Sequence, residues 1–161
     1  MKLGEALTER KRLQELIPQL SHALQQAITV EAGQPVNKAL VPAAKLKEQL
    51  TQALADLAAI VVNINHTNNE TQTESFGSVM QAIGRRESLM LKATHLKAVL
   101  GAIRPRKERG YGKDDPDTEY VVAEGIHPAG LRTEFDQSAE TLRKLTAELQ
   151  TVNWTTELIT L

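Results

Sequence analysis

The sequence predicts a mostly α-helical protein, built as an antiparallel helical bundle or as coiled-coil-like hairpins of four helices, with a short β element between helices three and four. Two observations favour helices. Apolar residues recur in steps of three and four along four long stretches, and 41% of the 161 residues are hydrophobic while only 3% are aromatic, so the core is aliphatic. A chain of this length fits one domain, residues 1–161, with an irregular and partly β segment at about 104–127.

The first predicted helix runs from Leu3 to about Val30. Its apolar face uses positions 3, 6, 13, 17, 20, 24 and 27, and Arg10 completes the series. Pro18 lies inside this pattern, where it removes a backbone donor, so we expect a kink near residues 14–18 that does not necessarily end the helix. The segment 31–38 contains Gly and Pro and is interpreted as a connection.

The second helix is predicted from Val41 or Pro42 to Thr67, because Pro42 suits a first-turn position. Its apolar series is Leu50, Leu54, Leu57, Val61 and Ile64. Asn68 comes next, where another aliphatic side chain is expected. Either the helix stops there, or a polar group is held inside the protein.

The third helix is expected to start after the polar stretch NNETQT, with Ser75 as its N-cap. Arg86 fills the one gap in its apolar seam, which consists of Ala82, Leu89, Ala93, Leu96, Leu100 and Ile103. The fourth helix has Pro128 near its first turn. Its seam steps by four and three without a break, as in a coiled coil: Leu131, Phe135, Ser138, Leu142, Leu145, Leu149 and Val152.

The connection between the third and fourth helices is about 27 residues, which is too long for a plain connector. Thr118–Glu124 is its only good strand candidate, because Tyr120, Val121 and Val122 stand together. Such a strand would pair within the segment or with the same strand of a second subunit.

Composition and charge limit the class of protein. The net charge of −1 and the pI of about 6.4 give no overall attraction to nucleic acid or to an anionic membrane. The absence of Cys excludes disulfides and thiolate chemistry. The opening residues lack the apolar region of a signal peptide, and the most apolar stretch, Ala53–Ile64, is shorter than the roughly 20 residues that span a bilayer. We therefore expect a cytoplasmic protein without a membrane partner.

No metal site and no cofactor is expected. The four histidines, His22, His66, His95 and His127, are scattered and show no metal-binding spacing. Phosphate loops and nucleophile elbows are absent as well, so no residue is assigned a catalytic role and enzymatic activity stays undecided.

The run Arg104–Lys113 is basic and includes Tyr111, so it resembles a phosphate-gripping segment. Three aspartates follow directly, at 114, 115 and 117, and would repel phosphates. A solvated loop is therefore preferred over a nucleic-acid interface.

Polar residues on the apolar seams are the main candidates for a site. If the four helices alternate up and down, matching their heights brings one set of side chains to the same end: Glu5, Glu9, Arg10, Asn65, Thr67, Asn68, Arg85, Arg86 and Trp154. A structural polar layer is the preferred interpretation, in which Asn68 joins Asn65, Arg86 and Glu5 or Glu9. A ligand pocket is the alternative, with Arg86 as a bidentate anchor for a carboxylate or phosphate.

Four segments also resemble a known family: KLGEALTER, INHTN, RRESLMLK and the closing NWTTEL. They are similar to signatures of the septicolysin-like family of small bacterial proteins, over nearly the whole chain. The resemblance implies a mostly helical fold and an oligomer, but no mechanism. Matching positions are Glu5, Glu9 and Arg10; Asn65, Thr67 and Asn68; Arg85 and Arg86; and 153–157. The sequence departs from the family pattern at RGYGKDDPDTEYVV, where an Arg-Tyr-Ser-Arg-like run is expected.

From these observations we expect a self-associating helical protein with an assembly or scaffold role, whose partner is itself as a homo-oligomer. The alternative is a small-molecule binder or enzyme that uses the polar cluster, and a weaker alternative is nucleic-acid binding through residues 104–113. Although the family name suggests a cytolysin, the sequence has no segment able to line a pore without burying charges, so we expect no pore formation.

Overall fold

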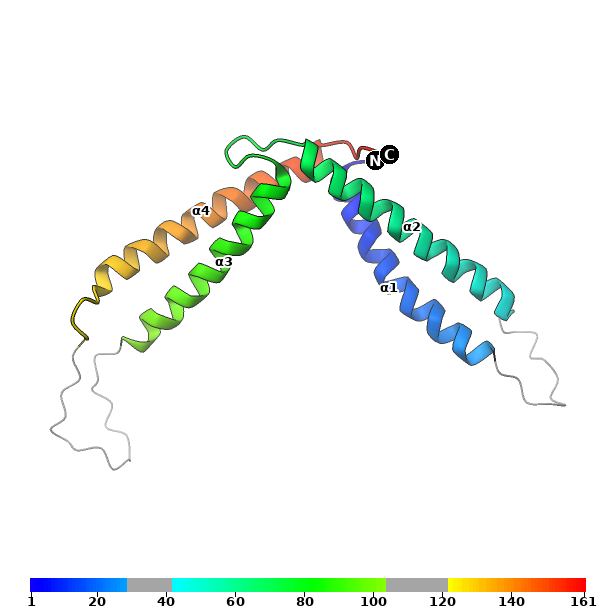
Figure 1. Ribbon diagram of the computed structural model, residues 1–161, viewed down its shortest axis with the longest axis horizontal. Coiled ribbons are helices and arrows are strands. Elements are labelled where there is room, and N and C mark those ends of the chain that lie inside the picture. Colours follow the sequence, from blue (N-terminus) through cyan, green and yellow to red (C-terminus); the bar gives the residue numbers. More distant parts are fainter. Residues whose placement is uncertain (29–41, 104–121) are drawn as a thin grey trace, which may run out of the picture.

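The computed structural model describes residues 1–28, 42–103 and 122–161. These residues form four α-helices: α1 (Leu3–Ala27), α2 (Ala43–Glu70), α3 (Val79–Ala102) and α4 (Pro128–Thr155). Figure 1 shows that α1 pairs with α2 as a first antiparallel hairpin and α3 with α4 as a second, and that the hairpins join at one end and spread apart like the arms of a V. We call the end where they meet the junction.

The four helices and the hairpin pairing agree with the prediction, but a bundle around one shared core is not confirmed. Within the described residues, contacts between the hairpins join α1 to α4 and α2 to α3, whereas α1 and α3 do not approach each other. The first hairpin has its own buried cluster, Leu3, Ala6, Leu13, Ala53, Ile60 and Ile64. The second has another, Val79, Ala82, Leu145 and Leu149. Each helix thus buries one stripe against its hairpin partner.

Helix boundaries follow local chemistry. α1 continues through Pro18, as expected. α2 continues to Glu70, past the predicted end at Thr67, and its last turn contains the polar residues in question. α3 is capped by Ser78 and not by Ser75: the Ser78 hydroxyl accepts from the Gln81 N–H at 3.3 Å, and Gln81 Oε1 accepts from the Ser78 N–H at 2.9 Å. This reciprocal capping box satisfies two backbone donors, which Ser75 cannot do from its place in the preceding turn.

The predicted β element is not seen. No sheet is formed by the described residues, and Val122–Glu124, the part of the predicted strand that lies among them, is not a strand. Residues 118–121 lie outside the described residues. The described β structure consists of two isolated bridges at the junction, Lys2 with Glu157 and Gln72 with Ser78.

The two hairpins repeat each other. α2 and α4 have 28 residues each, and α1 and α3 have 25 and 24. Counted from the helix starts, buried residues fall at equivalent positions of the two hairpins: Leu3 and Val79, Ala6 and Ala82, Ala53 and Ser138, Ile60 and Leu145, and Ile64 and Leu149. By the same count, Arg86 of α3 occupies the position equivalent to that of Arg10 in α1.

Backbone hydrogen bonds at the junction repeat as well. The Val79 N–H donates to the Thr71 carbonyl at 2.9 Å, and the Leu3 N–H donates to the Thr156 carbonyl at 2.9 Å. Thr71 and Thr156 are the C-caps of α2 and α4 and have nearly the same extended backbone angles. The junction therefore has an approximate two-fold symmetry within one chain.

Candidate functional site

The polar end of α2 binds the segment that follows α4. Thr67, which is fully buried, donates its hydroxyl to the Asn63 carbonyl at 2.7 Å and accepts the Ile159 N–H at 2.9 Å. Asn63 Oδ1 accepts the Leu161 N–H at 3.2 Å. These side chains supply acceptors for the non-helical segment after α4, whose backbone donors lack helical partners.

The second hairpin uses a related contact at its own side of the junction. The Glu148 carboxylate on α4 accepts the Ser75 N–H of the turn between α2 and α3 at 2.8 Å. In the same turn the Thr73 hydroxyl donates to the Gly77 carbonyl and accepts from the Phe76 N–H. Gly77 has a φ of 78°, which glycine adopts without strain. Polar side chains at the junction thus bind both the turn between α2 and α3 and the segment after α4.

Of the neighbours of Thr67, Asn68 is buried with 7% of its surface exposed, whereas Asn65 is exposed. α2 therefore does not stop at the polar run. It continues with Thr67 and Asn68 turned into the junction, which answers why the apolar series is interrupted there.

The two seam arginines each have a buried side-chain nitrogen without a hydrogen-bond partner. Arg10 and Arg86 are half-buried, and the Nε of each is buried without a hydrogen-bond partner. A buried donor left unpaired costs about 1–3 kcal/mol. Because Arg10 and Arg86 stand at equivalent positions, an unpaired buried guanidinium nitrogen is a feature common to the seams of both hairpins.

The expected carboxylate partners are bound elsewhere. Glu5 accepts the Lys2 N–H at 2.7 Å, and Glu9 forms a bidentate pair with Arg12 at 2.6 and 2.7 Å. The hydrogen bond from Arg12 holds the pKa of Glu9 below its ordinary value. No described hydrogen bond or ion pair links Arg86 to Glu5 or Glu9, so the cluster expected around Asn68 lacks its charge pair.

Arg85 and Trp154 lie at the junction surface. The Arg85 guanidinium stacks over the Phe76 ring, 5.3 Å from its centroid, which is a cation–π contact. Trp154 is 63% exposed. Its ring lies against Gly4, where an added Cβ would approach it to 3.1 Å, so Gly4 makes room for the indole.

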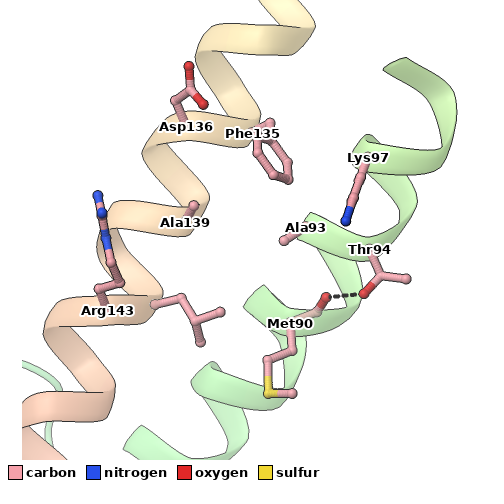
Figure 2. A pocket seen from close by; sticks show the side chains of 9 residues that line it. Met90, Ala93, Thr94, Lys97, Phe135, Asp136, Ala139 and Arg143 are labelled. Carbon is pink, nitrogen blue, oxygen red and sulfur yellow. Dashed lines mark hydrogen bonds between the residues drawn. The ribbon is translucent and has the colours of Figure 1, made fainter. Parts of the chain in front are cut away.

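A groove of about 640 Å³ lies away from the junction, between α3 and α4. Figure 2 shows Met90 and Ala93 on one side and Phe135 and Ala139 on the other, with Lys97 and Arg143 nearby. Its wall is mainly apolar, and it is open to solvent. The sequence reasoning missed this groove, although the replacement of a large seam residue by Ala93 could have indicated it.

Three further observations concern possible sites elsewhere in the chain. The basic run 104–113 lies outside the described residues. Within the described part of the chain, no three His, Asp or Glu side chains are grouped so that they could hold a metal ion. No described helix combines the length and apolarity that a membrane span requires.

The comparisons give a family and a fold relative. Residues 10–158 match a family of unknown function, DUF6847, and the chain belongs to this family. It is also similar to the crystal structure of a functionally unknown conserved protein from Corynebacterium diphtheriae, at 26% identity over 99% of both chains and with a TM-score of 0.77. None of the curated proteins matches the chain.

These findings correct the family prediction. The resemblance to septicolysin-like proteins is wrong, because the matching family model is DUF6847 and neither it nor the solved structure indicates a septicolysin-like family. The short motifs that suggested it contain the junction residues 65–68 and 153–157, which have structural contacts to make in this fold. Short motifs of that kind do not by themselves identify a family.

Proposed function

We propose that this member of the DUF6847 family is a self-associating protein of the cytoplasm, with an assembly or scaffold role that it performs as a homo-oligomer. The supporting observation is the amount of apolar side chain left on the surface of the two hairpins. A hairpin of two helices buries one stripe of each helix, and the two hairpins do not cover each other along their arms. Self-association would cover the apolar surface that the two hairpins leave exposed.

Large apolar residues are exposed on three of the four helices, including Leu54 on α2, Met90 and Leu91 on α3, and Trp154 on α4. Single exposed apolar residues are ordinary, whereas exposed apolar side chains that lie together on one helix face are typical of an interaction surface. The two small buried clusters are also a modest source of stability for a chain of 161 residues. Association between copies would add to the buried apolar area.

Light scattering after size exclusion, from about 1 to 100 µM, tests the proposal. We expect a mass that is a multiple of 17.7 kDa at the higher concentrations. A mass of one chain throughout this range would refute self-association. Repeating the experiment in 1 M salt separates apolar association, which persists, from attraction between surface charges, which is screened.

A second candidate function is binding of a small anionic molecule by the seam arginines. The observation that favours it is the unpaired Nε of Arg10 and of Arg86, because a guanidinium with unused donors matches a carboxylate or phosphate. Thermal melting with citrate, inorganic phosphate and acetate would test it. An increase in melting temperature that disappears in Arg10→Met or Arg86→Met, but not in Arg85→Met, would support the site. No increase with any of them at millimolar concentration would refute it for these anions.

A further inference from the structure

The face of α3 that points away from its hairpin partner has a second helical stripe. Its positions are separated by four, three, four, four, three and four residues, which places them on one side of a helix. All are exposed: Met80, Gly84, Glu87, Leu91, His95, Ala98 and Ala102. Leu91 is 61% exposed and Met80 40%. α3 is thus apolar on its inner seam and largely apolar on its outer face.

The first hairpin shows that this hairpin fold does not require an apolar outer face. The equivalent positions on α1, after Gly4, are Thr8, Lys11, Glu15, Gln19, His22 and Gln26. α1 is therefore an ordinary amphipathic helix with one solvated face. α3 has apolar residues on two opposite faces, as is typical of a helix that is buried on both sides. Within the described residues no other helix covers this face, because α3 contacts only α4 and α2.

We infer that the outer face of α3 is a contact between two copies of this chain, in which the two α3 helices pack antiparallel about a two-fold axis at Leu91. This inference rests on the proposed self-association and names its surface. In such an isologous contact, the two-fold axis determines which residue of the second copy lies opposite each residue of the first. With Leu91 against Leu91 of the second copy, Glu87 lies opposite His95, Gly84 opposite Ala98, and Met80 opposite Ala102.

Hydrogen-bonding groups and side-chain sizes are complementary in this register. Glu87 and His95 meet twice, once on each side of the axis, and an imidazole N–H is a donor that matches the acceptors of a carboxylate. A parallel contact would instead align Glu87 with Glu87 and His95 with His95. The small residues Gly84, Ala98 and Ala102 permit close approach of the helices, and Met80 meets a small partner. Figure 1 shows that α3 lies on the inner side of the V, with α4 on its other side.

Two variants test the surface against the proposed function. Leu91→Glu gives α3 the residue that α1 has at its equivalent position, Glu15, so folding should be preserved; far-ultraviolet circular dichroism checks this. Val62→Glu is the matched control, since Val62 is exposed to a similar extent, 51%, but lies on α2. We expect Leu91→Glu to weaken dimerisation at least tenfold in sedimentation equilibrium, and Val62→Glu to have little effect.

The outcomes are distinguishable. If the unmodified chain is monomeric at all concentrations, the proposed function fails and this contact fails with it. If the chain associates and Leu91→Glu does not weaken the association, or Val62→Glu weakens it equally, only the α3 contact is overturned.

A distance measurement tests the direction of the helices without changing Leu91. The chain has no Cys, so a single Gly101→Cys substitution, at an exposed position outside the stripe, carries one nitroxide label. At 1.5 Å rise per residue, antiparallel packing about Leu91 separates the two labelled backbones by about 30 Å along the helix, whereas parallel packing leaves them at about 10 Å. Double electron–electron resonance should give the long distance. The short distance, or no defined distance in an associated sample, would overturn the antiparallel contact.

Discussion

The two hairpins repeat one another at the junction but differ along their arms. In the first hairpin, Leu13 and Leu46 remain buried far from the junction, with 2% and 7% exposed. Their equivalents in the second hairpin, Leu89 and Leu131, are only half-buried. The repeated helix lengths and caps therefore define the backbone arrangement, while the degree of packing along each arm depends on individual side chains.

A change in side-chain size at one pair of equivalent positions explains much of the difference in packing between the two arms. Ile17 packs against the first core, whereas Ala93 stands at the equivalent position of α3 and lines the groove. The smaller side chain leaves space between α3 and α4, beside Phe135. The second hairpin thus combines a looser interior with a more apolar exterior, as expected if its arm is stabilised by contacts outside its own chain.

The largest expected effect distinguishes the two arms directly. Leu13→Ala should lower the free energy of unfolding by about 2–5 kcal/mol, because it leaves a cavity in a closed core. Leu89→Ala should cost clearly less in the monomeric chain, since Leu89 is already partly solvated and its surroundings can collapse. Urea unfolding of both variants measures this. Equal losses would mean that the two arms are packed alike.

The second prediction concerns the defect that the arms share. Arg10→Met and Arg86→Met should each raise the free energy of unfolding by up to about 2 kcal/mol, because they keep an apolar stem and remove a buried donor without a partner. Arg85→Met is the control and should gain nothing, as Arg85 is exposed. Thermal and urea unfolding provide the values. A loss of stability in either seam variant would show that its guanidinium has a partner in the protein as purified.

The helices could be predicted well from the sequence. Their number, their order and most of their boundaries followed from apolar spacing, and Pro128 marked the start of α4 as expected. The prediction of Ser75 as the N-cap of α3 is wrong: the cap is Ser78, which with Gln81 has the capping-box pattern. The arrangement of the helices was harder, because apolar seams predict which faces are buried but not whether hairpins share a core.

The candidate site was predicted only in outline. Height matching brought the helix ends to one end of the molecule, and Figure 1 shows the junction there. It did not reveal that Glu9 is held by Arg12, a neighbour one turn away, because local pairs compete with distant ones for the same carboxylate. The internal repeat is hard to see in the sequence, because few residues are identical at equivalent positions of the two hairpins, whereas their burial repeats.

A third, smaller effect concerns the junction. Thr67→Val gives α2 the residue that α4 has at its equivalent position, Val152, and removes the acceptor of the Ile159 N–H. We expect a loss of about 1 kcal/mol in the free energy of unfolding and faster hydrogen exchange at Ile159. Thr67→Ser, which keeps the hydroxyl, is the control for the hydrogen bond. Unchanged exchange at Ile159 in Thr67→Val would indicate that this contact does not hold the segment.

The smallest effect distinguishes the two halves of the junction by charge. Glu157 contacts Lys2 at 2.7 Å and the N-terminal ammonium at 3.3 Å, whereas Gln72 and Ser78 stand at the equivalent positions and are neutral. The hydrogen bond from Lys2, and then that from the ammonium, lowers the pKa of Glu157 below its ordinary 4.5. Because the pKa of Glu157 is lower in the folded than in the unfolded state, its charge stabilises the folded protein at pH values above the unfolded pKa. This stabilisation is lost as the pH falls through the folded pKa.

Glu157→Gln should therefore reduce the melting temperature slightly at pH 7, with the difference shrinking as the pH falls below about 4.5 and in 1 M salt. The pair is exposed, so the effect is small. Gln72→Glu at the equivalent position is the control, and it should gain nothing, because the residue it faces is Ser78 and not a lysine. Melting curves at pH 3, 5 and 7 decide the matter: a difference that stays constant across this range would show that the Glu157 charge has no part in joining the hairpins.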